Sequence, residues 1–327
     1  MSYVLYRQWL AAAALACAIA PVVTQAASGP GGYPAKPVRV LVGSPAGSGS
    51  DVMMRAVAQK LTERFGQPVI VDNRPGATGG IALQLAAQAI PDGYTLATLS
   101  AQNVTAMLLG TVTTDIQREL TAIVQMISQP YLLVATPSLP ANSVKELITL
   151  AKARPLVYAS SGTGSVVHLG MELFKSMAGV EMTHIPYKGS GLSMIDVMSG
   201  RVQLAITNTL TATPLVRSGR LKALAITSSR RVQAFHDLPT VAEAGVPGYE
   251  LRSWYGLLSP NKAAAPLLAH LNHEVTATMN APEVREKLAA DGAEAAGPNT
   301  PAQFREVIRT EIARWGKIIK NLGLRDK

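Results

Sequence analysis

The chain has 327 residues, 48% of them hydrophobic and 16% charged, so it can bury a sizeable core and is not a disordered chain. Its formal net charge is +9, but the lysines and arginines are scattered, and no basic run exceeds Arg230-Arg231. Because no basic stripe with interleaved aromatic residues is present, we expect no nucleic-acid partner. A chain of this length accommodates two domains.

The N-terminus predicts a signal peptide that spans residues 1–26. Arg7 supplies a positive charge, residues 9–23 are apolar, and small residues at positions 24 and 26 suit a signal peptidase. The apolar stretch is shorter than the about 20 residues of a membrane span. We therefore expect cleavage near Ala26 or Ala27 and export to the periplasm.

Cys17 is the only cysteine, and it lies inside the predicted signal peptide. After cleavage the chain would have no thiol, which excludes disulfides, cysteine-bound zinc and thiol catalysis. A lipid anchor on Cys17 is the alternative that we favour less, because Ala14 stands where a lipoprotein signal prefers leucine.

After the signal, short apolar runs alternate with helical patterns in two successive units. In the first unit, we expect strands at 38–42, 68–72 and 95–100 and helices at 51–65 and 81–90. In the second unit, we expect strands at 156–160, 181–185, 202–207 and 221–227 and helices after 143, after 165 and at 190–199. Further helices are expected at 264–280, 282–290 and 301–321. This alternation predicts the α/β class, with a mostly parallel sheet flanked by helices in each unit.

The helix-rich C-terminal tail has to bury its apolar side chains, and packing on the first unit is the simplest arrangement. We therefore expect a discontinuous first domain of residues 33–126 plus 250–327 and an inserted second domain of residues 127–249. The chain would cross between the domains twice, near 125–134 and near 248–256. Two such crossings favour a hinge, with a ligand cleft between the domains.

Two loops rich in glycine and serine stand at corresponding places in the two units: "GSPAGSGSD" (43–51) and "SSGTGS" (160–165). Each follows a strand and precedes a helix, where free N–H groups attract anions. Roles as ordinary helix caps and tight turns are the alternative. Facing each other across a cleft, the loops would suit an anion of moderate charge. Their candidate ligand-binding residues are Ser44, Ala46, Gly47, Ser48, Gly49, Ser50 and Asp51 in the first loop and Ser161, Gly162, Thr163, Gly164 and Ser165 in the second.

Other loops contribute further candidates. Ser100 and Gln102 follow the third strand, Tyr187 belongs to the strand-to-helix loop "IPYKGSG" (185–191), and Asn208 ends a strand. His168 lies one turn into the helix after the second loop, where it either lines the cleft or packs against its own helix.

Nucleotide binding and catalysis are disfavoured by what these loops lack. Neither loop has the lysine of G-x-x-x-x-G-K-[ST], and neither has the third glycine of a dinucleotide-binding loop. No G-x-S-x-G motif is present, and His168 is the one candidate base for Ser48 or Ser161. We expect a binding protein with no catalytic residue, metal or cofactor, and we keep a hydrolase as the alternative.

Six stretches, in order, resemble the Bug family of extracytoplasmic solute receptors of tripartite tricarboxylate transporters. They are residues 33–80, "PDGYTL" (91–96), "SVKELITLAKA" (143–153), "HIPYKGSG" (184–191), "LPTVAEAGVPGYE" (238–250) and "SWYGLLSP" (253–260). The resemblance covers about residues 33–320. It implies a two-domain periplasmic-binding-protein fold of type II character that closes on a small solute. In that family the solute is typically a carboxylate, held by the loops that correspond to residues 44–51 and 160–165.

The chain departs from the pattern of this family in the first loop and at the residue before Asn208. The family commonly has an aromatic residue followed by Pro-Pro-Gly-Gly in the first loop, whereas this chain has Ser44 and Ala46 in place of the aromatic residue and the second proline. An aspartate often precedes the asparagine at position 208, whereas Thr207 stands here. Because a carboxylate at that position would pair with a ligand amino group, its absence favours an uncharged or hydroxylated tail over an amino acid.

The resemblance implies a monomeric periplasmic receptor that delivers a small organic carboxylate to the membrane permease subunits of a tripartite tricarboxylate transporter. A sensor that reports the solute to a membrane kinase is an alternative that the sequence leaves open.

Overall fold

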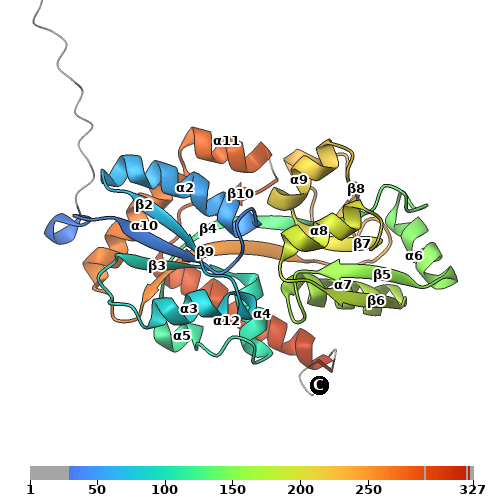
Figure 1. Cartoon of the computed structure of the whole chain (residues 1–327), viewed down its shortest axis with the longest axis horizontal. Helices are drawn as coiled ribbons and strands as arrows, with labels where there is room; N and C mark the ends of the chain where they lie inside the picture. Colours follow the sequence, from blue (N-terminus) through green and yellow to red (C-terminus); the bar gives the residue numbers. More distant parts are fainter. Residues whose placement is uncertain (1–28, 291, 322, 325–327) are drawn as a thin grey trace, which may run out of the picture.

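The computed structural model describes residues 29–290, 292–321 and 323–324 (Figure 1). The predicted signal peptide and Cys17 lie outside these residues.

The first part of the chain alternates strands with helices. Its elements are η1 (Pro30–Gly32), β1 (Val38–Val42), α2 (Gly49–Phe65), β2 (Val69–Asn73), η2 (Ala77–Gly79), α3 (Gly80–Ala87), β3 (Thr95–Ser100), α4 (Ala101–Leu108) and α5 (Ile116–Glu119). Helix α2 forms because Met53, Val57 and Leu61 recur every four residues and bury one face of the helix. It ends where Gly66 takes the left-handed conformation, with φ of 63°.

The remaining elements follow in the same alternating manner and end in helices. They are β4 (Leu120–Ala135), α6 (Val144–Ala153), β5 (Leu156–Ser160), α7 (Val166–Ala178), β6 (Met182–Pro186), α8 (Ser190–Met198), β7 (Leu204–Asn208), α9 (Thr209–Arg217), β8 (Lys222–Ile226), η3 (Gln233–Phe235), β9 (Arg252–Pro260), α10 (Ala265–Met279), α11 (Pro282–Ala290), β10 (Glu294–Ala295) and α12 (Pro301–Asn321). Ser143 caps α6 as its sequence predicts, accepting a hydrogen bond from the N–H of Glu146.

All ten strands belong to one sheet with the order β2-β1-β3-β9-β4-β7-β5-β6, and β8 and β10 also pair with β4. Strand β1 is parallel to β2 and β3, and β5 is parallel to β6 and β7. The other pairs are antiparallel, because β4 and β9 run against their neighbours. The α/β class is confirmed, but the sheet is mixed and not mostly parallel as we expected.

Strand β4 is long enough to belong to both halves of the sheet. Its residues 120–130 pair with β9 in the first half, which also holds β1, β2 and β3. Its residues 131–135 pair with β7 and β8 in the second half, which also holds β5 and β6. Figure 1 shows β4 and β9 running through the middle of the elongated molecule.

Helices cover both faces of each half of the sheet. In the first half, α2 and α11 lie on one side and α3, α4 and α12 on the other, and in the second half α8 and α9 lie opposite α7 (Figure 1). One apolar core joins side chains of α3, α4 and α12 to those of α7. A second core holds α2, α10 and α11 against β1, and a third lies under α8 and α9.

Both predicted crossings overlap regular strands. Residues 125–134 lie within β4, and β9 begins at Arg252, inside the second predicted crossing. The division into residues 33–126 plus 250–327 and residues 127–249 stays a prediction.

Candidate functional site

A cavity of about 600 Å³ opens where the two halves of the sheet meet. Its walls are the loops after β1, β2, β5 and β6, together with the end of β3, the start of α4 and the end of β7, and its floor comes from β4 and β9. Because each wall loop leads into a helix or a 3-10 turn, the N-terminal ends of several helices converge on one space.

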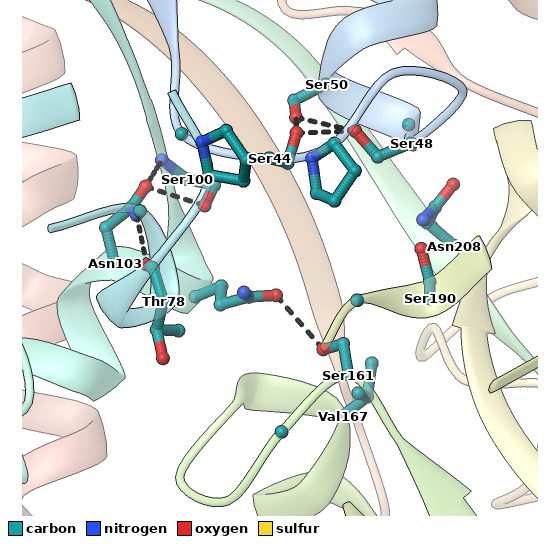
Figure 2. Close-up of a pocket in the computed structure, with 18 of the residues that line it drawn as sticks. Ser44, Ser48, Ser50, Thr78, Ser100, Asn103, Ser161, Val167, Ser190 and Asn208 are labelled. Atoms are coloured by element: carbon teal, nitrogen blue, oxygen red, sulfur yellow. Dashed lines mark hydrogen bonds between the residues drawn. The ribbon is translucent and has the colours of Figure 1, made fainter. Parts of the chain in front are cut away.

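The first wall loop follows β1 and carries three serines whose hydroxyl groups contact one another. The Ser44 Oγ atom is hydrogen-bonded to the Oγ atoms of both Ser48 and Ser50. Figure 2 shows this cluster above the cavity. Ser44, which replaces the aromatic residue common in the resembling family, therefore makes this wall polar.

Asp51 holds the first loop in shape and does not line the cavity. Its carboxylate accepts hydrogen bonds from the N–H of Gly47 (2.9 Å), from Asn73 Nδ2 (2.9 Å) and from Arg55 Nε (3.1 Å). Asn73 also donates to the carbonyl of Ser44 (3.1 Å). Burial alone would raise the pKa of Asp51, but the hydrogen bonds from Arg55, Gly47 and Asn73 hold it below its usual value.

The loop after β2, residues 75–79, forms a wall that the sequence analysis did not assign to the site. Asn103 Nδ2 donates to the carbonyl of Thr78 (2.9 Å), and Asn103 Oδ1 accepts from Ser100 in the capping box of α4. Gly43 and Gly79 lie so close that a Cβ on Gly43 would be 2.6 Å from the Cα of Gly79. The glycines of "NRPGATGG", after a strand, were the signal that could have identified this wall.

The second predicted loop, residues 160–165, only partly faces the cavity. Ser161, Gly162 and Thr163 line it, and the Ser161 Oγ donates to Gln102 Oε1 (3.2 Å) of the first half. This contact crosses the cavity in Figure 2. Ser165 is fully buried because its side chain caps α7, accepting from the N–H of His168.

His168 lies behind the second loop, and the interpretation that it lines the cleft is wrong. Its Nδ1 accepts a hydrogen bond from the N–H of Gly164 (3.1 Å), and its ring stacks on His184 at 4.0 Å. The ring faces the sheet because the α7 face that carries His168 packs on Tyr158 of β5 and His184 of β6.

The loop after β6 contributes Tyr187, Lys188, Gly189 and Ser190 to the lining. The Tyr187 hydroxyl donates to Asp196 Oδ2 (2.6 Å), and burial together with this bond raises the pKa of Tyr187 to about 12. The Tyr187 hydroxyl is therefore committed to Asp196. Lys188 is the only charged residue among the described residues that line the cavity.

Asn208 brings the second half of the sheet against the first loop. A Cβ on Gly49 would lie 2.5 Å from Asn208 Oδ1, so a larger residue at position 49 would displace the Asn208 side chain. Asn208 Oδ1 also accepts from the N–H of Thr211 (2.9 Å) and caps α9. Beside it, the buried Thr207 lines the cavity, and its Oγ has no hydrogen-bond partner among the described residues.

Three side chains from the crossing strands form the floor: Tyr131 of β4 and Ser253 and Tyr255 of β9. Burial raises the pKa of both tyrosines, that of Tyr255 to about 12, so both keep their protons at neutral pH. These three residues were not among the candidates, because each stands inside an apolar strand, where the sequence does not indicate which way a polar side chain points.

The cavity suits an anion by its charge distribution. The first turns of α2 and α8 have no side-chain cap, so their N–H groups are free for a ligand. A helix N-terminus also carries a partial positive charge. Among the described residues that line the cavity, none is acidic. Hydroxyl groups supply the remaining donors, which favours a carboxylate over a cation.

The structure brings eleven of the seventeen candidate residues into the lining and leaves six outside it. Ser44, Ser48, Gly49, Ser50, Ser100, Gln102, Ser161, Gly162, Thr163, Tyr187 and Asn208 line the cavity. Ala46 and Gly47 project into solvent at the tip of the first loop, and Asp51, Gly164, Ser165 and His168 support the loops from behind. These six candidate ligand-binding residues therefore lie outside the lining of the cavity.

Two further observations concern the part of the chain that the structure describes. No group of three or more His, Cys, Asp or Glu side chains there is placed to hold a metal ion. No helix there combines the length and the apolar character needed to cross a membrane.

The fold and the cavity define a solute receptor of the periplasmic-binding-protein class. The sequence pattern described as "Tripartite tricarboxylate transporter family receptor" matches residues 53–324. The chain belongs to this family, whose receptors are periplasmic. It is 35% identical over 300 residues to the protein BugT of Bordetella pertussis. The matched region covers 90% of this chain and 92% of BugT.

Solved structures of similar chains show the same fold. Rpa4515 of R. palustris, solved with adipate, is 37% identical, has a TM-score of 0.86 and covers 89% of this chain and 98% of its own. MatC of Rhodopseudomonas palustris, solved with bound malate, is 28% identical, has a TM-score of 0.82 and covers 88% of this chain and 100% of its own. The resemblance to the Bug family is thereby confirmed.

Proposed function

We propose that this protein captures a small organic carboxylate in the cavity between the two halves of its sheet and closes on it. The observation that carries this proposal is the composition of the cavity wall. Uncapped turns of α2 and α8 and many hydroxyl groups face the space, and none of its described lining residues is acidic. The adipate and malate in two similar structures support the same ligand class.

The eleven lining candidates are the ligand contacts in this proposal, and Lys188 receives a second carboxylate where the ligand has one. A ligand amino group finds no carboxylate among the described lining residues, so amino acids bind less tightly than plain acids. Two domains, residues 33–126 plus 250–327 and residues 127–249, rotate together on the ligand. The closed form is favoured by its extra contacts with that ligand.

In the cell, the receptor is exported by the signal peptide of residues 1–26 and acts as a monomer in the periplasm. It presents its ligand to the permease subunits of a tripartite tricarboxylate transporter, as its family membership suggests. Delivery to a sensor kinase is the alternative use of the same closed form.

A hydrolase is the weaker candidate. Catalysis would need a base in reach of a serine that faces the cavity. The Ser161 hydroxyl donates to Gln102, and the His168 Nδ1 is occupied by the N–H of Gly164. His184 contacts Ser160, but Ser160 is buried and outside the cavity lining.

The test compares acids with neutral analogues of the same shape. Adipate and malate are titrated into the protein by calorimetry and thermal denaturation, beside adipamide and aspartate. A ligand at 100 times its Kd adds about 2.7 kcal/mol of stability, which raises Tm by several degrees. We expect an acid to raise Tm in this way and adipamide to leave Tm unchanged. Equal effects of acid and amide, or no effect of either acid, would contradict the proposal.

A further inference from the structure

Two stacked histidines lie directly behind the second loop and outside the cavity lining. The rings of His168 on α7 and His184 on β6 are 4.0 Å apart, and both stack on Tyr158. The pair belongs to neither the cavity wall nor the apolar core, so neither ligand contact nor apolar packing accounts for its contacts with the loop.

His168 holds the C-terminal end of the loop. Its Nδ1 accepts from the N–H of Gly164 at 3.1 Å, so this nitrogen carries no proton and a neutral ring has its proton on Nε2. Gly164 has φ of 76°, a left-handed conformation that the bond helps to fix. The side chain of Ser165 binds the N–H of His168 in the same turn.

His184 holds the N-terminal end of the loop. Its Nε2 is 2.7 Å from Ser160 Oγ, which also contacts the N–H and the carbonyl of Gly162, both at 3.1 Å. All three contacts are satisfied together when Nε2 donates to Ser160, Ser160 donates to the carbonyl and the N–H donates to Ser160. This arrangement requires the Nε2–H form of His184.

We propose that His168 and His184, as neutral Nε2–H rings, are positioning residues that clamp the two ends of the 160–165 loop in its anion-binding shape. This inference rests on the proposed function of the cavity. The clamped segment carries Ser161, Gly162 and Thr163 into the lining. A free loop would have to be ordered by the ligand itself, which lowers affinity.

The surroundings of the pair favour the neutral state of both rings. Burial lowers the pKa of His168, and burial and the neighbouring His168 lower that of His184 to about 4. The charges that face the pair are Glu172 and Lys175 of α7, which pair with each other at 2.9 Å.

Two other groups complete this environment. Tyr158 donates its hydroxyl to Glu172, and the exposed Glu181 lies 3.6 Å from Lys175. The carboxylate of Glu172 acts to raise the pKa of both histidines, but burial lowers their pKa by more.

Four variants separate the hydrogen bonds from the stacking. His168→Phe and His184→Phe keep a flat ring but lose the polar atom, whereas His168→Asn keeps an acceptor near Nδ1 and His184→Gln keeps a donor near Nε2. Adipate and malate are titrated into each by calorimetry. We expect about tenfold weaker binding for each Phe variant and a change under about threefold for Asn and Gln. His270→Phe, at a half-buried stacked ring outside this loop, is the control and should bind as the wild type does.

Wild-type affinity in both folded Phe variants would overturn the inference. Nitrogen-15 NMR of the wild-type imidazoles provides a second readout that needs neither variant nor ligand. Protons on Nε2 of both rings near pH 7 are expected, and a proton on His168 Nδ1 would also overturn it. Failure of wild-type protein to bind either acid would count against the proposed function, whereas the NMR result would still decide the clamp.

Discussion

The carboxylate of Asp51 is 3% exposed and turns away from the cavity towards the groups that it binds. Arg55 Nη2 lies 2.9 Å from its Oδ1, so the negative charge is balanced locally. A carboxylate aimed at the cavity would repel an anion, whereas this one fixes the path of residues 44–47 through Gly47 and Asn73. Asp51 therefore shapes the first wall without contacting the ligand.

Asp51→Asn tests this role through stability and its pH dependence. At pH 7 the variant should lose about 1–3 kcal/mol of unfolding free energy, because it loses the charged bonds to Arg55. The pKa of Asp51 is held below its ordinary value of 3.8. Its carboxylate therefore adds stability above pH 3.8, and this contribution is lost as the pH falls through the lowered pKa. Urea unfolding at pH 7 and pH 3 should show a gap between wild type and variant that narrows in acid.

Asp115→Asn is the matched control. Asp115 caps α5, away from the cavity, and accepts from the N–H groups of Gln117 and Arg118. Because asparagine caps a helix about as well as aspartate, it should change the unfolding free energy by less than about 0.5 kcal/mol and leave the binding of adipate or malate unchanged. If Asp51→Asn were as stable as the wild type at pH 7, the loop would not depend on this carboxylate.

At the residue scale, the sequence located loops better than it located side-chain directions. Ser48 and Ser161 were predicted to face a ligand, and both line the cavity. The prediction succeeded because the backbone of these loops, near the helix N-termini, lies close to the cavity. Asp51 and His168 stand on the same loops and helices but turn towards Asn73 and His184. Asn73 and His184 come from other strands, so the local sequence offered only Arg55, four residues along α2, as a partner of Asp51 and could not predict these two contacts.

At the scale of elements, periodicity predicted α2 and α12 well, because their apolar residues recur at helical spacing over several turns. Helices α4 and α9 were missed, since each begins at the residue after a strand, without an intervening turn. Strands β4 and β9 were also missed. Residues 120–130 of β4 lie beside β9 only in the folded chain, and that long-range pairing defines both strands.

The contact between α12 and β9 has little free space. A Cβ on Gly256 would lie 2.1 Å from Phe304 Cζ and 2.8 Å from the carbonyl of Val124. Gly256→Ala should therefore cost about 1–3 kcal/mol through overpacking. Chemical denaturation with urea measures this cost as a lower midpoint.

Gly316→Ala provides the contrast within α12 itself. Among the described residues, no atom beyond its chain neighbours and the local helix backbone lies within 4 Å of a Cβ at this position, so alanine should stabilise the helix by about 0.5–1 kcal/mol. If Gly316→Ala destabilised the protein as much as Gly256→Ala does, the cost at Gly256 could not be assigned to its close approach to Phe304.

At the scale of the whole molecule, contacts between the two halves surround the cavity. Ser161 reaches Gln102, Gly49 meets Asn208, and Arg217 Nη2 donates to the carbonyl of Ala290 at 2.7 Å. The order of the family motifs predicted this fold. The arrangement of the two halves was not predictable, because it depends on contacts between residues that are far apart in the sequence.

A pair of cysteines at Gly49 and Asn208 would report closure of the cavity. A Cβ on Gly49 lies 2.8 Å from Asn208 Cγ, which places the two Cβ atoms within reach of a disulfide. Cys17, the only native cysteine, lies in the predicted signal peptide, so a mature double variant would hold just this pair. Under mild oxidation, adipate or malate should speed cross-linking by at least about tenfold, because a ligand that prefers the closed form raises its population.

The two single variants, Gly49→Cys and Asn208→Cys, separate closure from other oxidation, since neither can form the internal disulfide. The cross-linked double variant should also release bound acid more slowly than its reduced form, because the mouth cannot reopen. Adipamide should leave the cross-linking rate unchanged, since it carries no negative charge for the N-termini of α2 and α8 to attract. A cross-linking rate that is the same with and without the acids would mean that the two halves approach equally often without a ligand. Closure would then be a resting property of this molecule and not a response to its solute.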